Sequence, residues 1–250
     1  MKRWTVLVYG VTAYLLSAAT LIYSMLFLGN LFVSRTIDAA AGVPLGDPLL
    51  VNSGLLLAFA LQHGGMARAS FKAWLSRVLS PDIVRSTYVM LSCIALTLLM
   101  VLWQPIGGIV WRVDGPLAKQ VIMTVYFFGW VLMIWATFLL DHFELFGIKQ
   151  VWCRFRGLPA CDEPAFQTPS AYQIVRHPIY AGWVVVLWAS PIMTVAHFVL
   201  AIGLTAYVVY GIRLEERDLQ ERLPYYEQYR RKVPMLVPSW KKRLANPGED

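Results

Sequence analysis

Five long stretches of the chain contain no Asp, Glu, Lys or Arg. They comprise residues 4–34, 48–67, 86–111, 120–140 and 178–212. A helix that crosses a bilayer needs about 20 mainly apolar residues, at a rise of about 1.5 Å per residue, and each stretch is long enough. The chain is 58% hydrophobic and 15% charged, whereas soluble domains carry about 25% charged residues. The sequence therefore predicts an all-α fold, a polytopic membrane helix bundle.

The last charge-free stretch is too long for one spanning helix. Residues 178–212 would form a helix of about 52 Å, which exceeds the roughly 30 Å thickness of a hydrocarbon core. Ser190-Pro191 lies inside this stretch, and a serine followed by a proline is typical of a helix start. We expect a hairpin of two helices that turns near Pro191, with a first arm, residues 178–189, that packs against the second. The bundle then has four spanning helices plus this C-terminal helical hairpin.

The basic residues lie almost entirely on one side of these helices. The predicted topology puts 19 of the 22 lysines and arginines on the side of the N-terminus, and leaves Arg35, Arg112 and Lys119 on the other. Cytoplasmic loops carry such an excess. We therefore expect both termini and the active face on the cytoplasmic side of a bacterial-type inner membrane. The first stretch is about twice as long as the apolar core of a signal peptide, which disfavours cleavage.

The net charge of +7 agrees with that bias and with attraction to anionic lipid headgroups. No basic groove with interleaved aromatic residues is evident, so we expect membrane lipid, and no nucleic acid, as a partner. The cysteines, Cys93, Cys153 and Cys161, fit no metal-binding or redox spacing. We expect them to be free thiols and expect no metal site.

Ionisable residues gather in three clusters, residues 141–150, 176–182 and 213–218. The topology puts all three at the cytoplasmic face, and the second and third flank the same hairpin, so we expect them to lie close together. A pocket between them would have aromatic walls and rims of both charges.

The second cluster contains Arg176-His177-Pro178, followed by Tyr180 and Gly182. Proline in the first turn of a helix leaves the preceding backbone extended, and the unpaired N–H groups of that turn can bind an anion. Glycine allows a ligand to approach closely. An ordinary helix start with a snorkelling arginine explains the same residues.

The third cluster contains Glu215 and Glu216, one turn inside the boundary where basic residues are the rule. Their carboxylates could accept hydrogen bonds from ribose hydroxyls or an α-amino group. The alternative is pairing within the helix, with Arg213, Arg217 or Arg222.

The first cluster begins with Asp141 and His142, with Glu144 close behind. These residues could supply a base to a reacting thiol or hydroxyl, or could simply cap a helix end at the interface. Two further histidines stand apart: His63 faces the bundle interior or a headgroup, and we expect His197 to be structural.

Taken together, the C-terminal motifs resemble a known superfamily. The segments Arg176-His177-Pro178-x-Tyr180-x-Gly182, Glu215-Glu216 and Tyr229-x-x-x-Val233-Pro234 resemble the isoprenylcysteine carboxyl methyltransferases and phospholipid methyltransferases. Further segments resemble the methanethiol S-methyltransferase subgroup, and they run over nearly the whole chain. These are Gln62-His63, Arg85-Ser86-Thr87-Tyr88-Val89, Trp103-Gln104-Pro105 and His142-Phe143-Glu144-Leu145-Phe146-Gly147. The denitrification-associated membrane proteins share part of this pattern.

The resemblance implies S-adenosylmethionine as methyl donor, S-adenosylhomocysteine as its product, and conversion of methanethiol to dimethyl sulfide. The implied cofactor-binding residues are Gln150, Arg176, His177, Pro178, Tyr180, Gly182, Glu215 and Glu216. Position 180 is tyrosine where a related cofactor motif, Gly-x-Gly, begins with glycine. We divide the single structural domain into N-terminal transmembrane helices (1–140), a cofactor-binding region with the hairpin (141–238) and a flexible tail (239–250).

Methyl transfer from a sulfonium is an in-line displacement that requires alignment, a dry pocket and a thiolate, and no metal. A thiol is mostly protonated at neutral pH, since a free cysteine has a pKa of about 8.5, so a base or a cation nearby should raise the thiolate fraction. The candidate catalytic residues are Asp141, His142 and His177 as the base, and Arg176 as electrostatic support.

Three other functions fit part of the pattern. The acceptor could be a prenylated cysteine or a phospholipid amine, which needs a lateral opening for a long lipid. A sterol-reductase-like oxidoreductase would bind NADPH, but its 2′-phosphate calls for more clustered arginine than residues 213–217 provide. A non-catalytic membrane accessory protein of denitrification would need no cofactor. The sequence does not indicate an oligomeric state.

Overall fold

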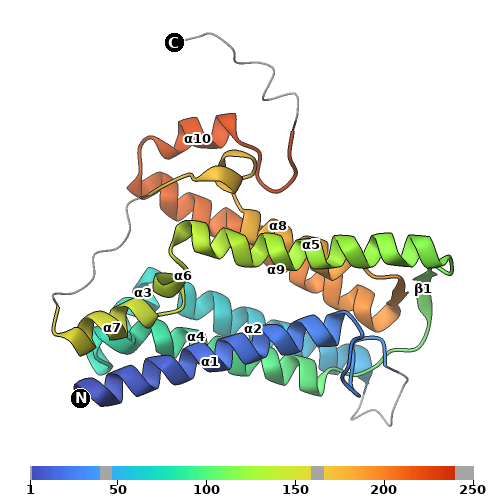
Figure 1. Ribbon diagram of the computed structural model, residues 1–250, viewed down its shortest axis with the longest axis horizontal. Helices are drawn as coiled ribbons and strands as arrows, with labels where there is room; N and C mark the ends of the chain where they lie inside the picture. The colour runs from blue at the N-terminus through green and yellow to red at the C-terminus, as the bar shows by residue number, and fades with distance from the viewer. Residues whose placement is uncertain (1, 40–46, 159–165, 240–250) are drawn as a thin grey trace.

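The computed structural model describes residues 2–39, 47–158 and 166–239, and it confirms an all-α membrane helix bundle (Figure 1). Five helices in this part of the chain are long and apolar enough to cross a membrane. They are α1 (Arg3–Leu28), α2 (Pro48–Ala67), α4 (Pro81–Leu102), α5 (Pro116–Leu140) and α9 (Val195–Arg222). The first four match the predicted spanning helices, and α9 is the long arm of the predicted hairpin. Its short arm is α8 (Pro178–Trp188).

Short polar helices cluster toward one end of the bundle. These are α3 (Ala69–Val78), α6 (His142–Leu145), α7 (Ile148–Arg156), a 3₁₀ turn η1 (Ser170–Gln173) and α10 (Tyr226–Lys232). Figure 1 shows α3, α6 and α7 near the N-terminus on the left, with α10 above them, while β1 (Ile109–Arg112) lies at the far right. The predicted tail, residues 239–250, falls outside the described residues except for Ser239.

Four helices begin at a proline, which occupies the first helical position of α2, α4, α5 and α8. Proline is favoured there because its fixed φ suits the helix and its missing N–H would have no partner within it. At α2 the preceding Asp47 also accepts hydrogen bonds from the backbone N–H groups of Leu49 and Leu50, at 2.9 and 3.2 Å. The chain thus marks its own helix boundaries.

Helix α8 packs against α9, as expected, and more extensively against α5. The reason is a pair of glycines. A Cβ atom on Gly182 would lie 2.7 Å from the carbonyl oxygen of Gly129, and one on Gly129 would lie 3.0 Å from the carbonyl oxygen of Gly182. Small residues let membrane helices approach this closely. Gly182, which we expected to leave room for a ligand, therefore faces α5.

The hairpin turns near Pro191 as predicted, but the second helix does not start there. Residues 192–194 form strand β2 (Ile192–Thr194), which pairs antiparallel with β1, and α9 starts at Val195 with Thr194 as its cap. The Ser190 and Pro191 carbonyls accept hydrogen bonds from Trp111 Nε1 at 3.0 Å and Val113 N at 2.9 Å. Pairing with β1 thus holds this segment extended, so the predicted helix start at Ser190-Pro191 was wrong.

A buried carboxylate–imidazole pair connects the loop after α1 to α9, at the end of the bundle where β1 and β2 lie. Asp38 Oδ2 is 3.0 Å from His197 Nδ1, and Asp38 Oδ1 accepts from the Thr194 hydroxyl at 2.7 Å. His197 Nε2 is 3.1 Å from the Leu187 carbonyl oxygen. Burial raises the pKa of Asp38, but hydrogen bonds and the charge of His197 outweigh burial and hold the pKa below its ordinary value. His197 is structural in this arrangement, as expected.

The cysteines differ from expectation at one position. Cys93 is a free thiol, whereas Cys153 in α7 is disulfide-bonded, so the prediction for Cys153 was wrong. Cys161 lies outside the described residues. Sequence spacing does not reveal which turns bring thiols together, because disulfide geometry depends on the local fold.

The Asp38–His197 pair generates a stability prediction. Asp38→Asn leaves His197 without its carboxylate in a buried site, and removing one partner of a buried pair costs about 3 kcal/mol or more. We expect the thermal midpoint in detergent to fall by roughly 6 °C or more, while Asp114→Asn, at an exposed position near the same end, leaves it unchanged. Equal midpoints for the two variants would contradict the assignment.

The same pair predicts a pH dependence. The folded-state pKa of Asp38 is below the unfolded value of 3.8, so the carboxylate stabilises the fold fully above that value and loses its effect as pH falls further. The midpoint difference between wild type and Asp38→Asn should therefore persist from neutral pH to about pH 4 and shrink at lower pH. Thermal melts over this range measure it; a difference that grows on acidification would be the wrong sign.

Candidate functional site

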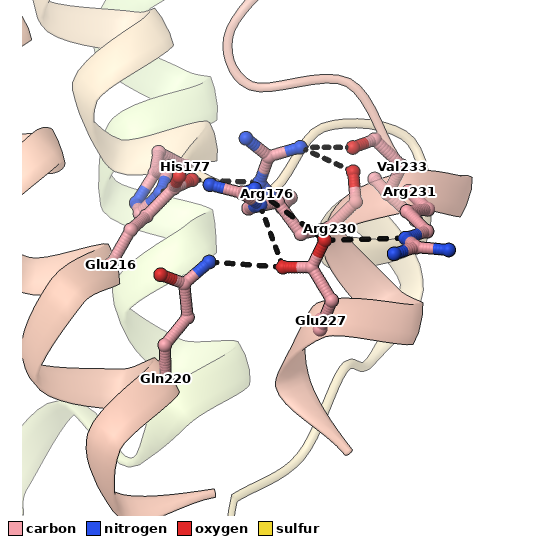
Figure 2. Close-up of polar contacts among 8 residues, drawn as sticks. All are labelled: Arg176, His177, Glu216, Gln220, Glu227, Arg230, Arg231 and Val233. Atoms are coloured by element: carbon pink, nitrogen blue, oxygen red, sulfur yellow. Dashed lines mark hydrogen bonds and ion pairs between the residues drawn. The ribbon is translucent and has the colours of Figure 1, made fainter. Parts of the chain in front are cut away.

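A buried ion pair joins the segment before α8 to the polar end of α9 (Figure 2). Arg176 Nε donates to Glu216 Oε1 at 2.7 Å, and only 8% of the arginine side chain and 10% of the glutamate side chain are exposed. Burying both charges costs free energy that their attraction offsets only when hydrogen bonding is complete. The remaining partners of these two residues therefore decide what the pair does.

His177 is a second partner of the Glu216 carboxylate. Its Nε2 lies 3.0 Å from the same oxygen, Glu216 Oε1. A carboxylate accepts and does not donate, so the proton in this contact lies on Nε2. We call Arg176, His177 and Glu216 the inner network.

The guanidinium of Arg176 is also bound from the opposite side. Its Nη1 donates to the carbonyl oxygen of Arg230 at 2.9 Å and to that of Val233, both at the end of α10. The Arg176 backbone N–H donates to the Pro234 carbonyl oxygen at 2.9 Å, and the His177 N–H to that of Met235 at 3.2 Å. The Arg-His-Pro and Val-Pro motifs of the sequence are thus two sides of one contact.

Outside this contact, α10 carries an exposed ionic network. Glu227 accepts from Arg230 Nε at 3.0 Å, from Arg231 Nε at 3.2 Å and from Gln220 Nε2 at 3.0 Å (Figure 2). The hydrogen bond from Arg231 and the neighbouring charges lower the pKa of Glu227. Such exposed pairs contribute little stability. A partly buried hydrogen bond also holds α10: the Tyr229 hydroxyl donates to the Tyr172 carbonyl oxygen at 2.6 Å.

The two consecutive glutamates face different surroundings. Glu216 is buried, whereas Glu215 is exposed and accepts a hydrogen bond from the Tyr180 hydroxyl at 3.1 Å. Consecutive residues on a helix point about 100° apart, which explains the division. In the described structure neither glutamate pairs with an arginine of its own helix; Arg217 pairs with Glu221 instead, at 3.3 Å.

Two further tyrosines lie beside the Tyr180–Glu215 contact. Tyr88 of α4 is close enough to Glu215 to interact with it electrostatically, and Tyr180 is within the same range of Tyr88 and Tyr207. Our sequence reasoning missed Tyr207. Its spacing was a usable signal, because residues 207, 211 and 215 recur every four positions and share one face of α9.

Asp141 forms the sharp corner between α5 and α6. Its backbone is left-handed, with φ of 95°, and its side chain accepts from the Glu144 N–H at 3.1 Å and pairs with Lys149 Nζ at 2.7 Å. The hydrogen bond from Lys149 is the main reason that the pKa of Asp141 is lowered. The carboxylate caps a helix and binds a cation of its own cluster.

Both ring nitrogens of His142 have protein partners. Its Nε2 lies 3.0 Å from the Tyr14 hydroxyl and its Nδ1 lies 2.8 Å from Thr137 Oγ1, while its ring stacks on Phe138 with centroids 4.2 Å apart. Burial lowers the pKa of His142. Nε2 therefore connects the α5–α6 corner to α1, and Nδ1 connects it to α5.

Gln150 belongs to the same corner. Its Nε2 donates to Glu144 Oε1 at 3.2 Å, and its Oε1 is buried without a partner among the described residues. The structure thus unites residues 176–182 with 213–218, as predicted, but places residues 141–150 in a separate cluster. Helix α4 connects the two clusters, because Arg85 Nε donates to the Leu145 carbonyl oxygen at 2.9 Å and Tyr88 lies one turn further along.

Comparisons with known proteins place these features in context. The model of the family described as NnrU protein matches residues 52–241. A methanethiol S-methyltransferase of Crocosphaera subtropica is 43% identical over 239 residues, which cover 95% of this chain and 93% of that protein. The protein of the same name from Mycobacterium tuberculosis is 42% identical over 239 residues, covering 95% and 98%. No solved structure matches the chain significantly.

Because Arg176 binds both Glu216 and the carbonyl oxygens at the end of α10, replacing it should loosen α10. Arg176→Lys keeps the charge but loses the planar fork that reaches Glu216 and the α10 carbonyls together. Hydrogen bonds of a charged donor are worth about 1.5–3 kcal/mol, so we expect amide hydrogen exchange in residues 226–235 to speed up by about tenfold or more. Arg217→Lys, an exposed control, should leave it unchanged. Equal protection in both variants would show that Arg176 does not hold α10.

Proposed function

Because the chain belongs to the NnrU protein family and is more than 40% identical to curated methanethiol S-methyltransferases over nearly its whole length, we propose that it is an S-adenosylmethionine-dependent methyltransferase. The proposed reaction converts methanethiol to dimethyl sulfide within the membrane. The structural observation that carries the proposal is the pair of glutamates on α9, one buried in the inner network and one exposed beside Tyr180.

The exposed half of this arrangement suits the methyl donor chemically. The Glu215 carboxylate can accept hydrogen bonds from ribose hydroxyls or an α-amino group. Aromatic rings attract a sulfonium cation. Tyr180 contacts this carboxylate, Tyr88 lies within electrostatic range of it, and Tyr207 lies within electrostatic range of Tyr180. The start of α8, with Pro178 as its first residue, offers backbone N–H groups to a carboxylate. The residues present therefore fit S-adenosylmethionine.

When bound, S-adenosylmethionine supplies an electrophilic methyl group on a positively charged sulfur. The inner network keeps the start of α8 and the polar end of α9 in fixed register, so that Tyr180 and Glu215 bind and orient the donor. In this account Arg176, His177 and Glu216 are positioning residues.

Asp141, His142 and Gln150 take a different part in the proposal. They fix the corner between α5 and α6, which contacts α4 through Arg85. We therefore assign them a structural role next to the site. Neither Asp141 nor His142 keeps an uncommitted atom for the thiol, since Asp141 binds Lys149 and both nitrogens of His142 have partners. The proton acceptor for methanethiol therefore has to be sought elsewhere.

We place the active face on the cytoplasmic side of a bacterial-type inner membrane. The inner network lies at the polar end of α9, next to the arginines of α10, and such basic segments remain in the cytoplasm. S-adenosylmethionine is made in the cytosol, and methanethiol, which is small and apolar, can enter from the lipid.

The direct test uses purified protein in lipid nanodiscs with S-adenosylmethionine and methanethiol. We expect dimethyl sulfide in the head space by gas chromatography, and little or no methylation of a prenylated cysteine or of phosphatidylethanolamine. Dimethyl sulfide absent with wild-type protein that binds the donor would overturn the choice of acceptor. Calorimetric binding of NADPH, and not of S-adenosylmethionine, would overturn the class of enzyme.

The role of Glu215 predicts a separate result. Glu215→Gln removes a charged acceptor worth about 1.5–3 kcal/mol, so we expect the dissociation constant for S-adenosylhomocysteine, measured by calorimetry, to rise about tenfold to a hundredfold. Glu221→Gln, which removes a carboxylate two turns away that pairs with Arg217, is the matched control and should bind normally. Normal binding by both variants would remove Glu215 from the cofactor site.

A further inference from the structure

His63 lies in an aromatic cluster that is separate from the inner network and from the corner at Asp141. Phe59, one turn earlier on α2, stacks on its ring with centroids 5.3 Å apart and planes 10° apart. Tyr88 of α4 stacks on it at 5.3 Å and 29°, and Tyr207 of α9 approaches edge-on at 6.1 Å. We call Phe59, His63, Tyr88 and Tyr207 the His63 cluster.

The Tyr88 hydroxyl contacts the imidazole in an unusual way. Its oxygen is 3.3 Å from Nδ1 and 3.2 Å from Nε2 of His63. An oxygen in the ring plane at equal distance from both nitrogens would overlap the carbon between them, so the hydroxyl lies over the face of the ring. A ring nitrogen exchanges its proton in the ring plane. Tyr88 thus orients the imidazole, and neither nitrogen has an in-plane hydrogen-bond partner in the described structure.

The other three histidines each have a hydrogen-bond partner on at least one ring nitrogen. His142 and His197 each have partners on both nitrogens, and His177 has its Nε2 on Glu216. Of the four histidines in the chain, His63 is the one whose two nitrogens both lack an in-plane partner in the described structure.

The His63 cluster adjoins the proposed cofactor site. Tyr88 and Tyr207 belong to the cluster and also lie within electrostatic range of Tyr180, which binds Glu215. The charged groups that face the cluster are Glu215 and Arg85, whose guanidinium carbon is 5.9 Å from the centre of the Tyr88 ring. The side chains of the cluster are aromatic, Phe59 is buried and the other three are half-buried, which is a composition that suits contact with a small apolar molecule.

We infer that the His63 cluster is the acceptor site and that His63 is the catalytic residue that takes the proton of the thiol. This inference rests on the proposed function. The S–H proton passes to an imidazole nitrogen of His63, and the electron pair left on sulfur forms the new bond to the methyl carbon. The bond between that carbon and the donor sulfur breaks, its electron pair returns to the donor sulfur as a neutral thioether, and His63 later releases the proton to water.

The first test separates chemistry from cofactor binding. General bases contribute about a hundredfold or more to a rate, so His63→Gln should lower dimethyl sulfide formation at least about a hundredfold while its affinity for S-adenosylhomocysteine stays that of wild type. Tyr9→Phe, which removes the hydroxyl that contacts Thr87 on another face of α4 at 2.9 Å, is the control and should retain wild-type activity. Full activity in His63→Gln would overturn the inference and leave the proposed function intact.

Two readouts distinguish proton transfer from a packing role. Infrared difference spectra of the protein with S-adenosylhomocysteine should show an imidazolium band when methanethiol is added, and His63→Gln should lack it. Methaneselenol ionises far more readily than a thiol, so the variant should methylate it with a much smaller defect. Equal defects with both acceptors, or no imidazolium band in wild type, would overturn the role of His63. Wild-type protein that forms no dimethyl sulfide would overturn the inference and the proposed function together.

Discussion

A carboxylate buried at the edge of a membrane must be paired, and Glu216 organises much of the surrounding structure through this requirement. Its Oε1 receives both Arg176 and His177. Arg176 in turn reaches the carbonyl oxygens that end α10. One charge therefore ties together four parts of the chain: the polar end of α9, the segment before α8, α10 and residues 233–235. A buried pair is weak evidence for net stability, but it specifies one register for these parts.

This arrangement gives the neighbouring residues Glu215 and Glu216 different roles. The buried glutamate binds Arg176 and His177 through Oε1, whereas the exposed Glu215 accepts a hydrogen bond from the Tyr180 hydroxyl. Tyr88 of α4 and Tyr207 of α9 lie within electrostatic range of Tyr180, and both pack against His63 of α2. The proposed donor site and the proposed acceptor site thus share a wall, as a direct transfer between two small molecules requires.

The sequence predicted the parts of the fold that depend on composition along the chain. Charge-free stretches located the long helices, and Pro178 marked the start of α8. The excess length of residues 178–212 revealed the hairpin. Ser190-Pro191 misled because pairing with β1 keeps that segment extended, and no local rule contains a contact with residues some 80 positions away. Gly182 misled for a similar reason, since its missing Cβ accommodates α5.

The candidate site was predictable in its motifs but not in its partnerships. Arg176, His177 and Glu216 meet as the hairpin topology indicated, and the sequence could not show that α10 uses the same arginine. The cluster of residues 141–150 looked equally reactive in sequence. In the structure its ionisable side chains bind one another and α1. The left-handed backbone at Asp141 forms the corner that brings them together. The His63 cluster depends on contacts between α2, α4 and α9, which periodicity alone does not specify.

The most direct test of this account is an electron cryo-microscopy structure of the protein in nanodiscs with S-adenosylhomocysteine bound. We expect ligand density against Tyr180 and Glu215, with the ligand sulfur directed at the His63 cluster and the inner network unchanged. Density beside Asp141, His142 and Gln150, with the Tyr180–Glu215 surface empty, would contradict it.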